Sequence, residues 1–327
     1  MKAAVCATYG SPDVIQITDV EKPVPGDNQV LIKVRAASVN PLDWHTVRGK
    51  PYLIRMMGGL RKPKDTRVGV DVAGQVEAVG GNVTQFKPGD EVFGLCKGSF
   101  AEYACTSESA SAMSVLTLKP ANVTFEQAAS LPVAAFTALQ GLRDKGRIQP
   151  GQKVLINGAA GGVGTFAVQI ARSFGADVTG VCSTGNVDMV RSLGANCVID
   201  YTQEDFTGSG NRYDIILDCV GNHTVSACRR VLNPSGTFVV VAGPDGWWLG
   251  PVARLLEALV LSPLVSQNLV PFIAKPSVAD LSIMLHLMET GKVTPVIDRQ
   301  YRLNEVPEAV RYLEKGHARG KVVITLP

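Results

Sequence analysis

The sequence has none of the closely spaced cysteine pairs that mark zinc sites and dithiol redox centres. Its seven cysteines are scattered, and no two of them are separated by two residues. Several stand in apolar runs, where cysteine behaves as a small hydrophobic residue. An odd number of cysteines without a pairing framework is typical of a reducing compartment, so we expect reduced, buried thiols.

The sequence also has little net charge and no long apolar run. A net charge of +3 without a basic cluster gives no sign of a nucleic-acid partner. The most apolar segment, Leu255 to Val265, is broken by Glu257 and Pro263 and is too short to span a bilayer. It fits a core helix, a dimer surface or a membrane-touching patch. The opening Met1–Tyr9 does not read as a signal peptide. We therefore expect a cytoplasmic protein without an integral membrane segment.

Length and apolar content are sufficient for two domains. The 327 residues include 46% hydrophobic and 19% charged residues, an ordinary balance for a chain with a packed core. Short alternating or apolar runs predict strands over Gln29–Ala37, Asp71–Val79 and Glu91–Phe93. A final strand is expected from Lys321 to Leu326.

From about Phe125, helix-like and strand-like segments alternate. A helix is expected over Glu126–Leu142, continuing across Pro132. Strands are then predicted at Lys153–Asn157, Asp177–Cys182, Cys197–Asp200, Tyr213–Asp218 and Thr237–Val241, and helices at Thr165–Phe174, Val187–Leu193 and Thr224–Leu232. This alternation predicts an α/β fold with a parallel, doubly wound Rossmann sheet.

A glycine-rich turn lies between the first of these strands and the following helix. Gly161, Gly162 and Gly164 let the backbone turn tightly and approach phosphate oxygens, and the helix N-terminus favours negative charge. Ala159 replaces the first glycine of the full dinucleotide fingerprint. The turn therefore predicts a site for a dinucleotide pyrophosphate, and the alternative is a merely structural turn.

The end of the second strand bears on the choice of nucleotide. NAD-preferring sites place an acid about 20 residues after the glycine turn. Here Cys182 is followed by Ser183, Thr184, Gly185 and Asn186, so hydroxyl groups stand where that acid would be. This pattern predicts NADPH, although Ser183 and Thr184 are also suited to capping the next helix.

Taken together, the motifs resemble the medium-chain dehydrogenase/reductase superfamily, in its zinc-independent quinone oxidoreductase branch. The similarity extends to chloroplast-envelope quinone/oxoene reductases and mitochondrial reticulon-interacting oxidoreductases. The matching segments are Asn40–Trp44, Gly69–Gly74, Phe86–Asp90, Ala129–Pro132 with Thr137–Ala138, Ala159–Gly164, Leu193–Ala195, Asp200–Tyr201 and Gly316–Lys321.

The resemblance implies a domain plan. It assigns residues 1–124 to a GroES-like β-barrel catalytic domain, residues 125–270 to an NADP-binding Rossmann domain, and residues 271–327 to a C-terminal return to the catalytic domain. In the family, the cofactor lies in the cleft between the two domains. A homodimer is also expected.

The resemblance also argues against a metal. Asn40 stands where zinc-dependent relatives have their first zinc cysteine, and Val70 replaces a histidine ligand. The cysteine-rich structural zinc lobe is missing, and the four histidines are dispersed. We therefore expect neither catalytic nor structural zinc.

Cofactor contacts are expected at positions from the turn, from the strand ends and from the family resemblance. They are Thr137, Ala160, Gly161, Gly162, Val163, Gly164, Ser183, Thr184, Tyr201, Ala242, His317, Ala318 and Arg319. In similar enzymes the tyrosine matching Tyr201 contacts the 2′-phosphate. The alternatives are a helix-interior threonine bonded to its own backbone for Thr137 and a solvated basic loop for Arg319.

Asn40, Asp43 and Tyr52 are the catalytic candidates. Asn40 is suited to orienting the nicotinamide ribose or the substrate oxygen, and Tyr52 to donating to the developing oxyanion. Asp43 would position these groups, since a carboxylate cannot donate. The competing interpretations are a turn at Asn40-Pro41 and an apolar loop around Tyr52.

Without a Lewis acid, acceptors that take hydride readily are favoured, and quinones and α,β-unsaturated carbonyls meet that requirement. We therefore expect an NADPH-dependent reductase of quinones or enones. Two alternatives stay open: a zinc-free alcohol or carbonyl reductase, and a noncatalytic NADPH-binding structural or assembly protein. Trp247, Trp248 and the apolar residues up to Phe272 suit an acceptor pocket, a dimer contact or core packing.

Overall fold

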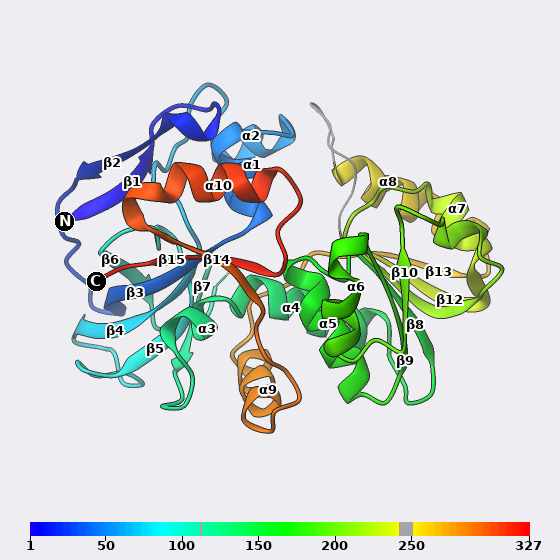
Figure 1. Cartoon of the computed structure of the whole chain (residues 1–327). Helices are drawn as coiled ribbons and strands as arrows, with labels where there is room; N and C mark the ends of the chain where they lie inside the picture. Colours follow the sequence, from blue (N-terminus) through cyan, green and yellow to red (C-terminus); the bar gives the residue numbers. More distant parts are fainter. Residues whose placement is uncertain (112, 242–250) are drawn as a thin grey trace. The chain divides into compact units, whose positions relative to one another are not determined.

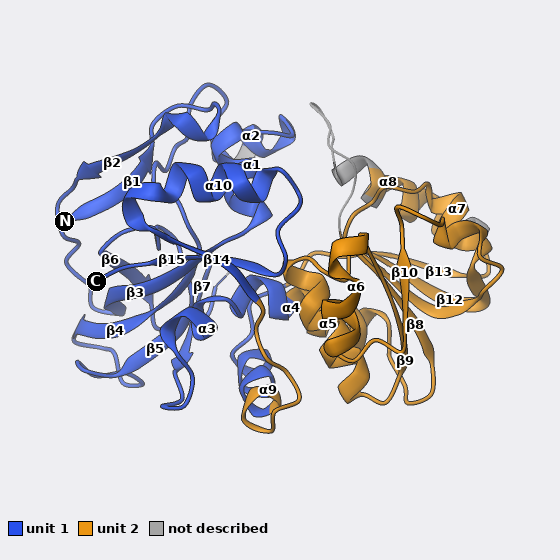
Figure 2. Ribbon diagram, in the orientation of Figure 1, with its two compact units in different colours: residues 1–136, 275–286, 297–327 blue, residues 137–274, 287–296 orange. Residues whose placement is uncertain are grey.

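The chain forms two compact units in a computed structural model that describes residues 1–111, 113–241 and 251–327 (Figure 1). Unit 1 consists of residues 1–136, 275–286 and 297–327, and unit 2 of residues 137–274 and 287–296 (Figure 2). Segments from both ends of the chain thus build unit 1, whereas unit 2 comes almost entirely from the middle.

Unit 1 is built on a mainly antiparallel sheet. The sheet has the order β14-β15-β3-β4-β5-β7, with β6 also paired to β3, and a separate hairpin joins β1 and β2. Its strands are β1 (Lys2–Cys6), β2 (Ile15–Asp19), β3 (Gln29–Val39), β4 (Asp71–Val79), β5 (Glu91–Cys96), β6 (Tyr103–Ser107), β7 (Ser114–Leu118), β14 (Ile297–Arg302) and β15 (Lys321–Thr325). The C-terminal β15 pairs antiparallel with β3, which brings Val322 opposite Val39.

Helices of this part of the chain are short. They are α1 (Pro41–Arg48), α2 (Leu53–Gly58), α3 (Phe125–Ala129) and α10 (Val306–Glu314), while α4 (Pro132–Gln140) and α9 (Val278–Glu289) begin in unit 1 and end in unit 2. Buried aliphatic residues from β3, β4 and β15 form one core with Val306, Ala309 and Val310 of α10. The C-terminal segment is therefore an integral part of the unit 1 core.

Unit 2 contains the expected parallel sheet. Its order is β10-β9-β8-β11-β12-β13, and every pair is parallel, as in a doubly wound nucleotide-binding fold. The strands are β8 (Lys153–Asn157), β9 (Asp177–Cys182), β10 (Cys197–Asp200), β11 (Tyr213–Asp218), β12 (Leu232–Val240) and β13 (Asn268–Pro271), and the helices are α5 (Gly162–Ser173), α6 (Val187–Ser192), α7 (Val225–Arg230) and α8 (Pro251–Leu261). The chain order reverses between β8 and β11, which is where such sheets bind ligands.

Several predicted boundaries differ from the structure: β12 begins at Leu232 rather than Thr237, and the helix expected over residues 224–232 ends at Arg230. Two further differences concern helices. The helix expected over residues 126–142 is divided, because α3 ends at Ala129 and α4 begins at Pro132. Proline lacks an N–H group and disfavours a helical residue before it, so it begins a helix more readily than it continues one. The second difference is that α5 begins at Gly162 rather than Thr165, and the glycine turn therefore supplies the first turn of the helix.

No helix in residues 1–111, 113–241 and 251–327 is long and apolar enough to cross a membrane. The apolar segment noted in the sequence falls largely on α8. There Ala258 is fully buried, whereas Leu259 and Val260 are exposed. This helix therefore presents an apolar side to solvent within the single chain.

Candidate active site

The turn from β8 to α5 depends on close packing of glycine. Gly158 has a φ of +84°, a conformation that residues with a Cβ rarely adopt. A Cβ on Gly164 would lie 2.0 Å from the carbonyl oxygen of Gly158. The helix therefore approaches the strand end so closely that position 164 has no room for a side chain.

Gly161 differs, because its backbone conformation is one that any residue can adopt. It is the N-cap of α5 with φ −82° and ψ 178°, and a Cβ there would be 3.5 Å from the nearest described atom. The first helical N–H groups have no intrahelical partner. No acidic residue stands in the first turn, and no side chain caps the helix. The open space beside these donors fits a pyrophosphate and would be filled by a side chain at position 161.

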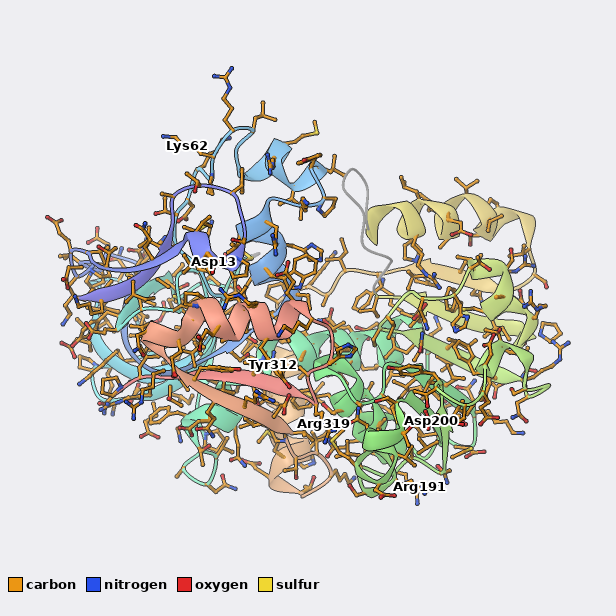
Figure 3. All side chains as sticks on the ribbon, turned by 45° about the horizontal axis from the view of Figure 1, so that its top comes forward. Asp13, Lys62, Arg191, Asp200, Tyr312 and Arg319 are labelled. Carbon is orange, nitrogen blue, oxygen red and sulfur yellow. The ribbon has the colours of Figure 1, made fainter. Side chains whose placement is uncertain are left out.

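At the end of β9, the structure places an acid from the neighbouring strand. Asp200, the last residue of β10, pairs with Cys182 of β9. Its carboxylate accepts hydrogen bonds from the hydroxyl groups of Thr184 (2.6 Å) and Thr202 (2.8 Å). Tyr201 is half-exposed and follows directly (Figure 3 labels Asp200). Ser183 and Thr184 follow β9, and the Tyr201 N–H donates to Cys182 O at 3.0 Å, so all three predicted residues stand at the strand ends that also carry this carboxylate.

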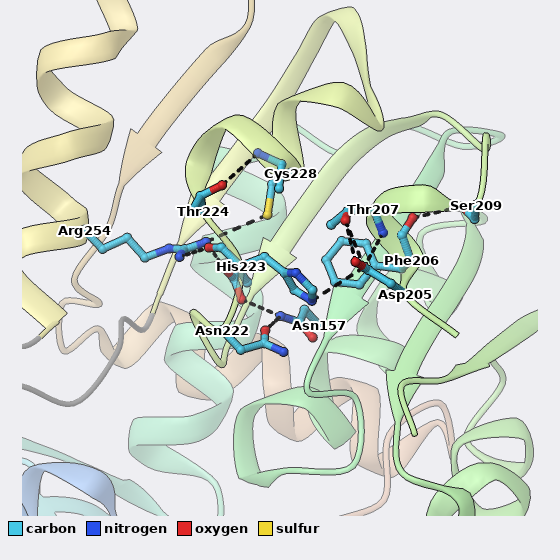
Figure 4. Close-up of polar contacts among 12 residues, drawn as sticks. Asn157, Asp205, Phe206, Thr207, Ser209, Asn222, His223, Thr224, Cys228 and Arg254 are labelled. Atoms are coloured by element: carbon cyan, nitrogen blue, oxygen red, sulfur yellow. Dashed lines mark hydrogen bonds and ion pairs between the residues drawn. The ribbon is translucent and has the colours of Figure 1, made fainter. Parts of the chain in front are cut away.

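The neighbouring strand end at β11 carries a buried ion pair. Asp218 accepts from Asn157 Nδ2 at 2.8 Å and from Arg254 Nη2 at 2.6 Å. Arg254, on α8, also donates to the backbone carbonyls of Gly221 and His223 (Figure 4). Removing one partner of such a pair leaves a buried charge without compensation. The pair therefore fixes α8 to the end of β11, beside the glycine turn.

In unit 1, Asn40 and Asp43 belong to a buried polar cluster. Asn40 is 1% exposed and donates through Nδ2 to Ser38 O and to Asp71 Oδ2, at 3.2 and 2.8 Å. Its Oδ1 accepts from Lys321 Nζ at 2.6 Å, and its backbone N–H donates to Asp43 Oδ2 at 2.7 Å. Every polar group of Asn40 in this cluster is therefore already bonded.

Asp71 completes the cluster. It accepts from Ser38 Oγ at 2.7 Å and from the backbone N–H of Val133, in the first turn of α4, at 3.1 Å. Lys321 Nζ lies 3.5 Å from Asp71 Oδ2. The cluster thus joins β3, β4, β15, α1 and α4 through one buried lysine and two buried carboxyl groups.

Burial shifts two titrations in this cluster. Desolvation raises the pKa of Asp43 to about 7, and the charge of Asp71 adds to this effect, while the N–H of Asn40 opposes it. Desolvation also lowers the pKa of Lys321, against the pull of Asp71 and Asp43.

Tyr52, the third catalytic candidate, is more accessible. It is partly buried at the N-cap of α2, and the Arg55 guanidinium lies 4.7 Å from its ring centre and 4.5 Å from that of Tyr9. Arg55 also donates to the carbonyl of Gly49 at 2.9 Å. The Tyr52 ring is therefore held by a cation–π contact with Arg55.

The remaining predicted cofactor residues fall in both units. Thr137 is buried in α4. His317 and Arg319 are exposed in unit 1, and the Arg319 N–H donates to Asp298 Oδ2, which also accepts from the Tyr312 hydroxyl (Figure 3). Ala242, Trp247 and Trp248 lie outside the described residues.

Across residues 1–111, 113–241 and 251–327, no group of three or more His, Cys, Asp or Glu side chains is placed to hold a metal ion. Asn40 lies between an amide, a carboxylate and an ammonium group, as described above. Val70 is buried and aliphatic. The donor set around these two positions does not fit zinc.

Comparison with known proteins identifies the family. The profile of the alcohol dehydrogenase GroES-like domain matches residues 26–117, and that of the zinc-binding dehydrogenases matches residues 193–324. The chain is 34% identical to the NADPH-dependent alkenal/one oxidoreductase, chloroplastic, of Arabidopsis thaliana, over 99% of this chain and 79% of that protein. The chain belongs to the medium-chain dehydrogenase/reductase superfamily.

Two further relatives support this membership. The chloroplast envelope quinone oxidoreductase homolog of Arabidopsis thaliana is 33% identical, over 95% of this chain and 93% of that protein. The structure of the quinone oxidoreductase from Coxiella burnetii superimposes with a TM-score of 0.88 at 29% identity, covering 100% of this chain and 99% of that one. The predicted superfamily and fold class are thus confirmed.

Several residues of the site are not indicated by sequence patterns. Asp71 and Lys321 stand in the segments that carry the superfamily resemblance, but their meeting with Asn40 depends on the pairing of β15 with β3. The sequence indicates Tyr201 at this sheet edge but not Asp200. The available signal was its position as the last residue of a predicted strand, since carboxyl ends of parallel strands share one edge.

The two turn glycines make a paired prediction. Gly161→Ala should change the free energy of unfolding by less than about 1 kcal/mol, because the cap backbone suits any residue. It should weaken NADPH binding about tenfold, because the methyl group enters the pyrophosphate space. Gly164→Ala should instead destabilise the fold by about 1–3 kcal/mol, because its Cβ collides with Gly158 O.

Urea unfolding and calorimetric titration with NADPH measure the two effects. Equal affinity of Gly161→Ala and wild type would contradict the assignment of this space to the pyrophosphate.

Asp43 should make stability depend on pH. Its pKa of about 7 in the folded protein lies above its value in the unfolded chain, so the folded state binds the proton more tightly. The resulting stabilisation is complete below about pH 4 and is lost as the pH rises through about 7, with a slope of up to about 1.4 kcal/mol per pH unit. Asp43→Asn should flatten this slope. Urea unfolding from pH 4.5 to 7.5 checks it, and identical slopes in both proteins would refute it.

Proposed function

We propose that the chain is a zinc-independent oxidoreductase that reduces quinones or α,β-unsaturated carbonyl compounds with NADPH. The observation that carries the nucleotide part is the open space over Gly161 at the N-terminus of α5, beside the switch point of the parallel sheet. The acceptor class is supported by the relatives named as quinone and alkenal/one oxidoreductases. When bound, the nicotinamide supplies the hydride.

The predicted residues take distinct roles in this proposal. Ala160 to Gly164 bind the pyrophosphate, and Ser183, Thr184 and Tyr201 surround the adenosine ribose. Thr137, Ala242, His317, Ala318 and Arg319 stay candidates for further cofactor contacts. Within the described residues, the Arg319 guanidinium has no hydrogen bond or ion pair, which leaves it available to a phosphate.

Asn40 and Asp43 act in this proposal by holding the first turn of α1 rather than by contacting the acceptor. Asn40 would need to give up one of its buried bonds to orient a ligand, and Asp43 is itself buried. Tyr52, which is partly exposed, is the proposed donor to the oxygen on which negative charge develops. A conjugated acceptor spreads that charge, so one neutral donor is sufficient.

The domain plan belongs to the same proposal, with residues 1–124 as the catalytic domain, 125–270 as the NADP-binding domain and 271–327 as the return segment. The participation of β15 in the unit 1 sheet supports the return segment. A homodimer and a cytoplasmic location stay predictions, since named relatives include chloroplastic proteins.

An acceptor panel separates this function from its two alternatives. NADPH oxidation should be rapid with quinones, 2-alkenals and oxoene lipids and negligible with simple ketones, because no Lewis acid polarises an isolated carbonyl. Comparable rates with simple ketones would favour a carbonyl reductase. Tight NADPH binding without turnover on any acceptor would favour a noncatalytic binding protein. Higher turnover with NADH than with NADPH would overturn the cofactor assignment.

Tyr52→Phe tests the oxyanion donor. The variant should lower kcat by about ten- to a hundredfold, because one preorganised donor is lost, while the affinity for NADPH stays unchanged. Tyr9→Phe is the matched control, since Tyr9 contacts the same Arg55 and its hydroxyl donates to Gly59 O at 2.7 Å. Steady-state kinetics with a quinone should show the loss in Tyr52→Phe alone. Equal kcat in Tyr52→Phe and wild type would exclude the role.

A further inference from the structure

The carboxyl ends of β9 and β10 place three polar side chains together. Asp200 ends β10, Thr184 follows β9, and Thr202 follows Asp200 by two residues. The two threonine hydroxyls lie 2.9 Å apart and each bonds to an oxygen of Asp200. The backbone N–H of Thr202 donates to the same carboxylate at 3.0 Å. The group is therefore a closed hydrogen-bonded triad on one sheet edge.

Counting protons shows what this triad offers a ligand. Each hydroxyl has one proton, and both protons are directed to Asp200 or to the other hydroxyl. Thr184 and Asp200 thus present lone pairs outward and no donor. A ribose 2′-hydroxyl is a donor and fits this arrangement, whereas a 2′-phosphate carries only acceptor oxygens.

Charge acts in the same direction. Among the described residues, Asp200 forms no ion pair that would offset its charge. The Thr184 and Thr202 bonds hold the pKa of Asp200 below its usual range, so the carboxylate is ionised at neutral pH. A 2′-phosphate beside it would face a like charge.

Two nearby hydrogen-bond donors act in the opposite sense and favour the 2′-phosphate. Ser183 Oγ accepts from Asn186 Nδ2 at 3.1 Å and keeps its own proton to donate. Tyr201 is 51% exposed, and its hydroxyl has no hydrogen bond within the described part of the chain. Two neutral donors therefore compete with one uncompensated carboxylate.

We propose that Asp200 is a specificity-determining residue of the nucleotide site, which favours a free ribose 2′-hydroxyl and limits the preference for NADPH over NADH. The residue thus performs from the third strand the task that an acid at the end of the second strand performs in NAD-preferring sheets. The inference rests on the proposed nucleotide-binding function and concerns its selectivity.

Asp200→Asn tests the inference directly. The amide removes the charge and can donate to Thr184 Oγ1, which frees the Thr184 proton for a phosphate. The ratio of NADPH to NADH affinity should rise about tenfold or more, the effect of removing one like charge a few ångströms from the phosphate. Adenosine 2′,5′-bisphosphate should gain by the same factor over 5′-AMP. Calorimetric titration of the whole protein measures all four ligands.

Two further variants separate the causes. Thr184→Val keeps the charge and removes the hydroxyl, so it should not raise the ratio. Asp177→Asn makes the same change of charge at the opposite end of β9 and should leave the ratio at the wild-type value. A ratio within twofold of wild type in Asp200→Asn, or an equal rise in Asp177→Asn, would overturn the inference while nucleotide binding itself stands. Failure of the wild type to bind either dinucleotide would overturn the proposed function as well.

Discussion

The contact between the α5 backbone and the end of β8 is the constraint on which the nucleotide site depends. The absence of a side chain at Gly164 lets the helix begin directly above the strand, next to Gly158 O. The helix N-terminus is thereby fixed at the edge where β8, β9, β10 and β11 all end. Asn157, Ser183, Asp200 and Asp218 come to one edge because parallel strands end on the same side.

Both units hold a buried carboxylate with a buried cation, and each pair fixes an element far away in the sequence. Asp218 and Arg254 tie α8 to β11, and Asp71 and Lys321 tie β15 to β4. Such pairs contribute little net stability after desolvation. Their effect is to make other positions of α8 and β15 costly, because a shift of either element would leave a buried charge without its partner. The precise placement of Asn40 follows from this requirement.

Much of the unit 2 fold could be predicted from the sequence, because its strands are short apolar runs bounded by glycines and polar turns. The predicted bounds of β8, β9, β10 and β11 agree with the structure. The division at Pro132 could not be placed, since helix propensity on both sides masks it. The triad at Asp200 needed the register of β10 on β9, and the cluster at Asn40 needed a contact across 281 residues. Local sequence patterns contain neither the strand register nor the long-range contact.

The closed state of the Asn40 cluster bears on the chemistry. Asn40, Asp43, Asp71 and Lys321 are all buried and bonded to one another, so none of them offers a free electrophile. Moving the Lys321 ammonium to a ligand would leave Asp71 uncompensated in a low-dielectric interior, which costs several kcal/mol by analogy with broken buried pairs, roughly 3–5 kcal/mol. In the proposed reaction, stabilisation of a developing oxyanion is therefore assigned to a more accessible neutral donor, Tyr52, rather than to this cluster. Acceptors that delocalise their charge need the least from such a site, and this is the physical reason to favour quinones and enones over isolated carbonyls.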